Sequence, residues 1–216
     1  MGQFFFRQWP FGVPFTILWL AAGYLQFFYS QNEILLRINH HWTPALDGLF
    51  KYGTYGGDGL FVLAVAALVL LFSRRHSLRI LLSYLLSSTL VHLGKQVLFP
   101  QAHRPWYTLS QVVPELHRVE GVVLYQSASF PSGHSTSAFA LCMMLALQAR
   151  CPWLKALCLL PALMVAFSRM YLLQHYPIDV HVGALLGVST SLLLYYYLEI
   201  QRQNYARWWP QKGRFT

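Results

Sequence analysis

Six long apolar segments, joined by shorter polar ones, constrain the fold of this chain more than any other feature of its sequence. They lie at residues 12–29, 54–72, 78–98, 133–149, 153–170 and 177–200. A helix of about 20 apolar residues is long enough to cross the hydrocarbon core of a bilayer. The second segment is the least regular, because Asp58 precedes its uninterrupted apolar part. With 56% hydrophobic and only 11% charged residues, the composition also differs from that of soluble domains. We therefore predict one all-α domain over residues 1–216, an integral-membrane bundle of six transmembrane helices.

The charged residues are sorted between the two sides of this predicted bundle. The side with both chain termini has ten basic residues against a single acid, Glu199: Arg7, Arg74, Arg75, Arg79, Arg150, Lys155, Arg202, Arg207, Lys212 and Arg214. On the opposite side, six basic residues balance six acidic ones. Basic loops stay in the cytoplasm, so we predict cytoplasmic N- and C-termini. The net charge of +9 then follows from topology and from attraction to anionic headgroups, and we predict no nucleic-acid partner.

The segment Pro131-Ser132-Gly133-His134 lies where a polar loop meets the fourth apolar segment. A helix N-terminus offers free N–H groups and partial positive charge, and glycine lets an anion approach the backbone. Ser132 can cap this helix and donate its hydroxyl proton. By itself, the segment is equally compatible with an ordinary Ser-Gly cap followed by an interfacial histidine.

The segment from Ser168 to Asp179 is more specific. Pro177 suits the first turn of the sixth helix, which puts His175 just before the helix and Asp179 within that turn. Across four residues, the carboxylate can bind one imidazole nitrogen and leave the other free to attack or to bind. The alternative is a His–Asp pair that only satisfies its own hydrogen bonds at a helix end.

Three cations, Lys95, Arg104 and Arg169, lie on the same predicted side as these two segments. Charged residues in apolar sequence are energetically costly and therefore indicate function. Three positive charges can bind a phosphate dianion and stabilise the charge on its oxygens during transfer. A lysine that only extends its amine to the interface is the alternative for Lys95. Because three distant segments meet on one face, we predict a phosphate site there.

A metal site is the competing interpretation. His175, Asp179 and His181 follow one another as zinc or iron ligands can. However, His181 is only two residues from Asp179, hence on another helix face, and the three cations would repel a metal ion. We therefore predict neither a metal nor another cofactor.

Two connections on the side of the predicted site carry expectations of their own. Residues 30–53 mix apolar and polar residues, as in a short helix that lies in the headgroup plane. The connection 99–130 is the longest, and long loops are often functional. We expect it to cover the site, with a plain linker as the alternative.

The order Lys95, Arg104-Pro105, then P-S-G-H, then S-R-x5-H-x3-D resembles the type 2 phosphatidic acid phosphatase superfamily of integral-membrane lipid phosphatases. The last two motifs match throughout. The first departs from the family pattern, because eight residues separate Lys95 from Arg104 where the family usually has six. The resemblance covers the catalytic half, roughly residues 90 to 190.

The resemblance implies a two-step mechanism without a metal. His175 would attack phosphorus to give a phosphohistidine, Asp179 would orient its ring, and His134 would protonate the leaving oxygen and then activate water. The phosphoryl oxygens would be bound by Lys95, Arg104, Ser132, Gly133 and Arg169. Ser168 would support Arg169.

A site at the outer headgroup level favours a phosphorylated lipid as the substrate and partner. Candidates are undecaprenyl diphosphate, lipid A phosphate, phosphatidylglycerophosphate and phosphatidic acid, and the resemblance favours the first two. Small size favours a bacterial chain of the cytoplasmic membrane, with its site facing the periplasm or exterior. A phosphotransferase with the same phosphohistidine, and a non-catalytic lipid-binding or transport bundle, are the alternatives.

Overall fold

The described part of the chain contains helices and the loops that join them, and no strand. The computed structural model describes residues 7–208, and the side chains of residues 7–202. The elements, in chain order, are α2 (Trp9–Phe28), α3 (Gln31–His40), α4 (Pro44–Gly53), the 3-10 helix η1 (Thr54–Gly57), α5 (Gly59–Leu70), α6 (Arg74–Leu93), the π-helical turn η2 (Gly94–Leu98), α7 (Pro105–Leu109), α8 (Gly133–Gln148), α9 (Pro152–Leu157), α10 (Leu159–Tyr171) and α11 (Pro177–Trp208). The predicted basic residues Lys212 and Arg214 lie outside the described residues.

Several of these helices have the length and composition of membrane spans. Within the described residues, the four that qualify by themselves are Trp9–Phe28, Arg74–Leu98, Pro152–Tyr171 and Pro177–Arg202. Pro44–Gly57 and Gly59–Leu70 qualify together as a pair bent by 62°, which gives a fifth span if the pair is one broken helix. These observations confirm an all-α membrane fold.

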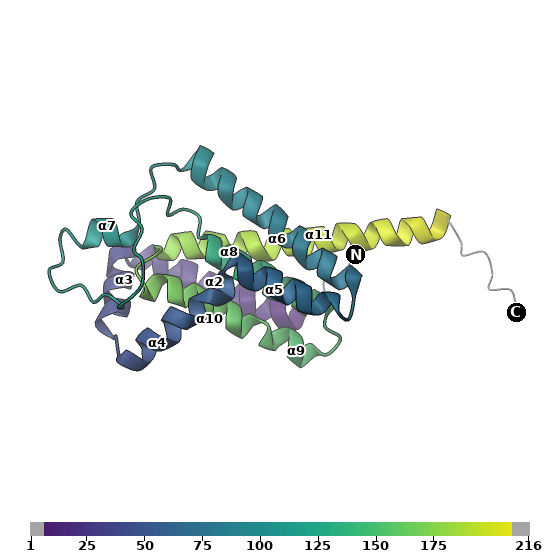
Figure 1. Ribbon diagram of the computed structural model, residues 1–216, viewed down its shortest axis with the longest axis horizontal. Helices are drawn as coiled ribbons and strands as arrows, with labels where there is room; N and C mark the ends of the chain where they lie inside the picture. Colours follow the sequence, from purple (N-terminus) through teal and green to yellow (C-terminus); the bar gives the residue numbers. More distant parts are fainter. Residues whose placement is uncertain (1–6, 209–216) are drawn as a thin grey trace, which may run out of the picture.

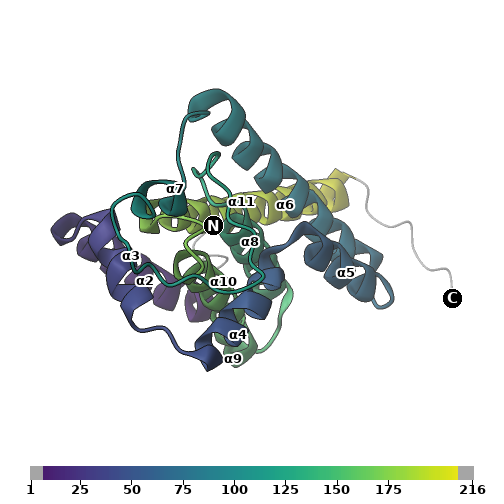
Figure 2. The ribbon, with the colours of Figure 1, turned by 60° about the vertical axis from the view of Figure 1, so that its left-hand side comes forward.

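The bundle is built around α8, which lies at its centre in both views (Figure 1 and Figure 2). Most residues of α8 are buried, and many of them are small. A Cβ atom on Gly183 of α11 would lie 2.8 Å from the carbonyl oxygen of Ser132, and one on Gly187 would overlap the carbonyl oxygen of Thr136. Small residues let helix backbones approach closely, which is the main way that membrane helices pack. The two glycines therefore hold α11 against α8 and fix the position of the first turn of each helix.

From the middle of the bundle to its end near the chain termini, α6 and α11 are joined by polar contacts. The hydroxyl groups of Ser83 and Ser191 are 2.7 Å apart, and Ser191 also donates to the carbonyl oxygen of Ala140 in α8. Closer to the chain termini, Arg79 of α6 contacts Glu199 of α11. The opposite end of α6 leans away from the bundle (Figure 1 and Figure 2). The bundle is thus tied together at one end and more open at the other.

The regular helix predicted from residue 54 is wrong in its first turn. The chain instead continues from α4 into η1, and α5 begins only at Gly59. Asp58 adopts an extended conformation, and its Oδ1 accepts a hydrogen bond of 2.8 Å from the N–H of Leu60. Asp58 is therefore the N-cap of a new helix, which explains why the apolar segment is least regular here. The fifth predicted span is likewise interrupted, between α9 and α10 at Cys158.

The two polar connections also have more structure than the sequence predicted. Residues 30–53 form two helices, α3 and α4, because Thr43 caps α4 and Pro44 opens it. The connection 99–130 contains α7 and is held against α3 and α4. Asn39 pairs with both backbone groups of His117, whose Nε2 lies 3.0 Å from the Asp47 carboxylate. The connection is thus fixed on the bundle.

Candidate active site

The N-terminus of α8 is capped as the sequence predicted. Ser132 is fully buried, and its Oγ accepts a hydrogen bond of 3.4 Å from the N–H of Ser135. Its own N–H donates to the carbonyl oxygen of Asp179, at 3.0 Å, which ties the first turns of α8 and α11 together. The first N–H groups of a helix have no partner within it. Those of Gly133 and His134 also make no backbone or side-chain hydrogen bond elsewhere in the described chain, so they can bind an anion.

His175 and Asp179 form the predicted pair. The Nδ1 atom of His175 lies 3.3 Å from Oδ2 of Asp179, and both side chains are almost completely buried. The same Oδ2 accepts hydrogen bonds from the hydroxyl of Ser129, at 2.5 Å, and from the N–H of Tyr176, at 3.0 Å. A carboxylate that is fixed in this way holds the imidazole ring in one orientation. The Nε2 atom of His175 makes no hydrogen bond to the described chain and is available for chemistry.

The charge environment of His175 contains the other predicted residues. Its pKa is well below the ordinary value of 6.5, first because the ring is buried and then because of the positive charges of Arg169, Arg104 and Lys95, with a smaller effect of His134. These groups, from four different elements or loops, therefore act on one imidazole. The low pKa keeps His175 neutral, which is the form that acts as a nucleophile.

Arg104 is held by backbone carbonyls rather than by a carboxylate. Its Nε donates to the carbonyl oxygen of Ser127 at 2.9 Å, and its Nη1 donates to Oε1 of Gln174, also at 2.9 Å. Gln174 in turn donates from Nε2 to the carbonyl oxygen of Val123. One glutamine next to His175 thus binds two parts of the connection 99–130, at Arg104 and at Val123. No salt bridge to Arg104 occurs in the described part of the chain, so its charge is free for an anion.

Lys95 belongs to the charge environment of His175 despite its longer spacing to Arg104. It lies in η2, a π-helical turn, and acts electrostatically on His175. A π turn is wound more loosely than an α-helix, and such turns are common at functional sites. Gly94 lets this turn pack against Pro131, because a Cβ atom there would lie 2.8 Å from the proline Cδ.

Comparison with known proteins assigns the chain to a family. The model of the PAP2 superfamily matches residues 76–203. The chain belongs to the PAP2 superfamily. An undecaprenyl-diphosphatase of Sulfolobus acidocaldarius is 30% identical over 172 residues, which cover 74% of this chain and 75% of the relative.

Two solved structures share the fold. The crystal structure of LpxE of Aquifex aeolicus has a TM-score of 0.66 and 25% identity, and the match covers 76% of this chain and 94% of LpxE. A transmembrane PAP2-type phosphatidylglycerolphosphate phosphatase of Bacillus subtilis has a TM-score of 0.65 and 20% identity, over 95% of this chain and 99% of the other. With the family match, these likenesses identify a PAP2-type lipid phosphatase of the membrane.

Arg169 differs from the sequence prediction in what holds it. Ser168 was expected to support this arginine, but its hydroxyl donates instead to the carbonyl oxygen of Val165, at 2.6 Å. The Nη1 of Arg169 donates to the hydroxyl of Thr54, at 2.8 Å, and its buried Nε has no partner in the described chain. Ser168 faces its own helix because a serine hydroxyl readily bonds to a carbonyl of the preceding turn. Sequence reasoning missed three residues that bond to the candidate site residues, namely Thr54, Gln174 and Ser129.

The alternative metal site receives no support from the position of His181. Its ring stacks on Trp19 of α2, with centroids 4.2 Å apart, and its carbonyl oxygen accepts from the indole N–H. Among the described residues, no group of three His, Cys, Asp or Glu side chains is placed to hold a metal ion.

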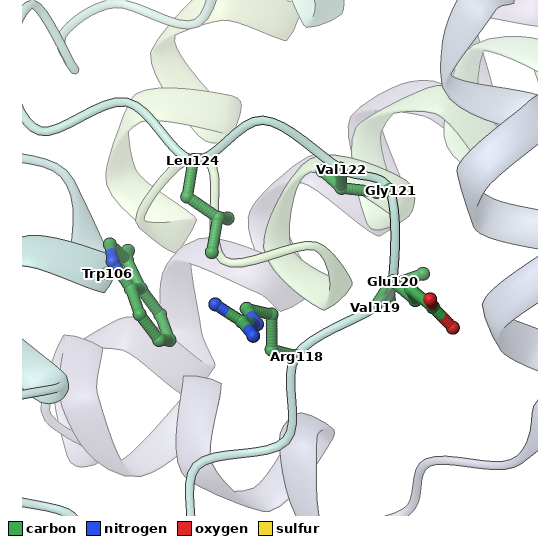
Figure 3. A pocket seen from close by; sticks show the side chains of 7 residues that line it. All are labelled: Trp106, Arg118, Val119, Glu120, Gly121, Val122 and Leu124. Carbon is green, nitrogen blue, oxygen red and sulfur yellow. The ribbon is translucent and has the colours of Figure 1, made fainter.

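Two hollows are lined by residues close in sequence to the candidate site residues. One of about 450 Å³ is formed by the connection 99–130, where Arg118 points toward Trp106 and Leu124 while Glu120 turns away (Figure 3). The other, of about 460 Å³, is almost entirely apolar and lies among α2, α3, α10 and α11. The apolar hollow is lined by Pro177, which follows His175 by two residues in the chain.

Proposed function

We propose that this protein hydrolyses the terminal phosphate of a phosphorylated membrane lipid in two steps, through a phosphohistidine on His175. The observation that carries the proposal is the buried His175–Asp179 pair, with 3.3 Å between Nδ1 and Oδ2, under the positive charges of Lys95, Arg104 and Arg169. A neutral, oriented imidazole in such a field is suited to attack a phosphate dianion.

In the first step, Nε2 of His175 attacks phosphorus in line with the bond to the lipid oxygen. The P–N bond forms as the P–O bond breaks, and His134 gives its proton to the departing oxygen. Asp179 stabilises the positive charge that develops on the ring of His175. The phosphoryl oxygens are bound by Lys95, Arg104, Arg169, Ser132 and the N–H of Gly133.

In the second step, water attacks the phosphohistidine. His134, now neutral, takes a proton from the water as the P–N bond breaks, and inorganic phosphate leaves. The same cations stabilise both transition states, because in each one the charge is spread over the three equatorial oxygens. No metal ion takes part in either step.

We propose six spans with both termini in the cytoplasm: α2, the broken pair α4 and α5, α6 with η2, α8, α9 with α10, and α11. The basic end, with Arg75, Arg79 and Arg202, then faces the cytoplasm, and the site faces the periplasm or exterior of a bacterial cytoplasmic membrane. A maleimide reagent that does not cross membranes tests this orientation in intact cells. We expect it to label a cysteine introduced at Gln111 and not the native Cys151, which is exposed at the basic end. The reverse pattern would contradict the orientation.

The proposed substrates are undecaprenyl diphosphate and lipid A phosphate, before phosphatidylglycerophosphate and phosphatidic acid. The name of the Sulfolobus relative supports the first of these. The apolar hollow beside Pro177 supports a lipid rather than a soluble ester, because it offers space for a hydrocarbon chain next to the site.

Phosphate release by the purified protein in detergent tests the proposal. With these four lipids, we expect turnover that survives EDTA, is inhibited by vanadate and falls by about 10⁴-fold or more in His175→Ala. His92→Ala is the matched control, since His92 is exposed on α6, and it should keep full activity. Loss of activity with EDTA and its return with one metal would refute the mechanism. A new phosphorylated product on thin-layer plates would identify a phosphotransferase instead.

A further inference from the structure

The break between α4 and α5 brings backbone into the bundle at the level of the site. The two helices meet at an angle of 62°, and η1 lies at the corner. A Cβ atom on Gly56 would lie 3.1 Å from a methyl group of Val165, and one on Gly57 would lie 2.5 Å from the carbonyl oxygen of His134. Only a glycine backbone can come this close to the first turn of α8 and to α10. The corner is therefore packed tightly against two elements that carry site residues.

The corner carries one buried hydroxyl, that of Thr54, and this hydroxyl contacts Arg169. The hydrogen bond from Nη1 of Arg169 to Oγ1 of Thr54 measures 2.8 Å. Both residues are more than nine-tenths buried. This is the one hydrogen bond of the Arg169 side chain within the described chain, because its buried Nε has no partner there and no carboxylate forms an ion pair with it. Thr54 thus holds one side of the guanidinium.

Arg169 also connects this contact to His175. The carbonyl oxygen of Arg169 accepts the backbone N–H groups of both Gln174 and His175, at 3.0 and 3.1 Å. The backbone of Arg169 is thereby fixed beside the proposed nucleophile, whereas its long side chain has several rotatable bonds. A hydrogen bond to a rigid partner selects one of the directions that those bonds allow.

We propose that Thr54 is a positioning residue, whose hydroxyl directs the guanidinium of Arg169 toward the phosphoryl group. This inference rests on the proposed function, in which Arg169 binds that group. The break between α4 and α5 matters for this role, because a continuous helix could not bring both the Thr54 hydroxyl and a glycine backbone to the same point. Thr54 acts through Arg169, and the free Nε and remaining N–H groups of the guanidinium are left to bind phosphate oxygens.

The variant that isolates the hydroxyl is Thr54→Val, because valine has almost the same shape and cannot accept a hydrogen bond. We expect kcat/KM to fall by roughly 10- to 100-fold, the effect of losing one hydrogen bond to a charged group. The loss should fall mainly on kcat, because the charge that Arg169 stabilises increases in the transition state. The inhibition constant for vanadate should rise by a similar factor, since vanadate imitates that state.

Further variants separate positioning from a structural role. Thr54→Ser keeps the hydroxyl and should restore activity to within about three-fold of the wild type. Thr89→Val is the matched control, because the hydroxyl of Thr89 bonds only to its own helix, at Leu85, and it should be unchanged. In an Arg169→Gln background, Thr54→Val should have no further effect, as expected when one residue acts only through the other. Vanadate inhibition is measured on folded enzyme, so a lower yield of the variant protein does not mimic a higher inhibition constant. If Thr54→Val does not fold, Thr54→Ala is measured in its place.

The outcomes distinguish this inference from the proposed function. A wild-type protein that is active, with Thr54→Val equally active and equally sensitive to vanadate, would refute the positioning role alone. Additive losses in the double variant would refute it as well, because Thr54 would then act through other residues. A wild type that cleaves none of the lipids but binds vanadate, with binding weakened in Thr54→Val, would refute the function and leave the positioning role supported.

Discussion

The arginines at the two ends of the bundle have different kinds of partner. At the end near the chain termini, Arg75, Arg79 and Arg202 all contact the carboxylate of Glu199, with N–O distances of 3.1, 3.1 and 2.9 Å. Arg79 also lies over the ring of Tyr195, at 4.3 Å from its centroid. These contacts join α6 to α11, and they neutralise part of the positive charge in the bundle itself.

At the other end, the arginines have no acidic partner among the described residues. Arg104 is held by carbonyl oxygens and Gln174, and Arg169 by the hydroxyl of Thr54. The nearby carboxylate, Asp179, is occupied by His175, Ser129 and the N–H of Tyr176. Neutral partners fix the direction of a guanidinium without cancelling its charge. An arginine whose charge is neutralised by a carboxylate can stabilise the fold, whereas an arginine held only by neutral dipoles keeps its charge available for an anion.

The largest expected effect comes from exchanging an arginine at each end. Arg169→Gln should lower kcat/KM by about 100- to 1,000-fold, as loss of one charged group that stabilises a transition state does. It should not lower the melting temperature, because it removes an unpaired buried charge. Arg79→Gln should keep the activity but lower the melting temperature by about 3–6 °C, since it removes the buried arginine of a partly exposed ion-pair cluster. Both expectations are checked by thermal unfolding and phosphate release of the two variants. An Arg79→Gln enzyme that is stable but inactive would contradict the different roles of the two arginines.

The second effect concerns the corner that holds the arginine at the site end. A Cβ atom on Gly57 would lie 2.5 Å from the carbonyl oxygen of His134 and 2.7 Å from Val165, so Gly57→Ala must push η1 away from α8 and α10. We expect a loss of roughly 30-fold in kcat/KM, comparable to other losses of supporting contacts. Gly48→Ala in α4 is the matched control.

Open space surrounds Gly48, with no atom within 4 Å of an added Cβ. Alanine is also the better residue within a helix, so Gly48→Ala should be fully active and slightly more stable. Equal activity of the two variants would show that the tight corner does not matter for the site.

Two contacts of the candidate site could be predicted from the sequence because they are local. His175 and Asp179 are four residues apart on either side of a proline that begins a helix, so their contact needs no knowledge of the tertiary fold. The Ser132 cap follows from the same local logic. Both predictions are confirmed by the hydrogen bonds that the structure contains.

The supporting contacts could not be predicted because they join distant parts of the chain. Thr54 and Arg169 are 115 residues apart, and Ser129 and Asp179 are 50 apart. A buried serine or threonine has no sequence signature, since either can bond to its own helix, as Ser168 does. One signal was present: Gly56, Gly57 and Asp58 interrupt an apolar segment, and such a break in a membrane span needs a reason.

The third effect tests the neutral partners of Asp179. Ser129→Ala removes the hydroxyl that lies 2.5 Å from Oδ2, and leaves the N–H of Tyr176 and the His175 ring in place. Because the carboxylate is then held less firmly, we expect a loss of about 10-fold in kcat/KM. Ser110→Ala, at an exposed position at the end of α7, should have no effect. Full activity of Ser129→Ala would mean that backbone contacts alone orient Asp179.

The smallest effect is the dependence of stability on pH, which follows from the unneutralised charge at the site end. Burial and the cations Arg169, Arg104 and Lys95 lower the pKa of His175 below 6.5. As the pH falls below 6.5, the unfolded chain therefore binds a proton at this residue while the folded chain does not. Stability must decrease in that range, by at most about 1.4 kcal/mol for each pH unit.

A variant without the titrating group isolates this contribution. Between pH 6.5 and 5, the melting temperature of the wild type should fall more steeply than that of His175→Gln, by about 3 °C for each pH unit. His40→Gln, at an exposed position of α3, should follow the wild type. Parallel curves for the wild type and His175→Gln would mean that the imidazole binds its proton equally well in both states. The cations around it would then have to be neutralised by some other group, and the contrast between the two ends of the bundle would disappear.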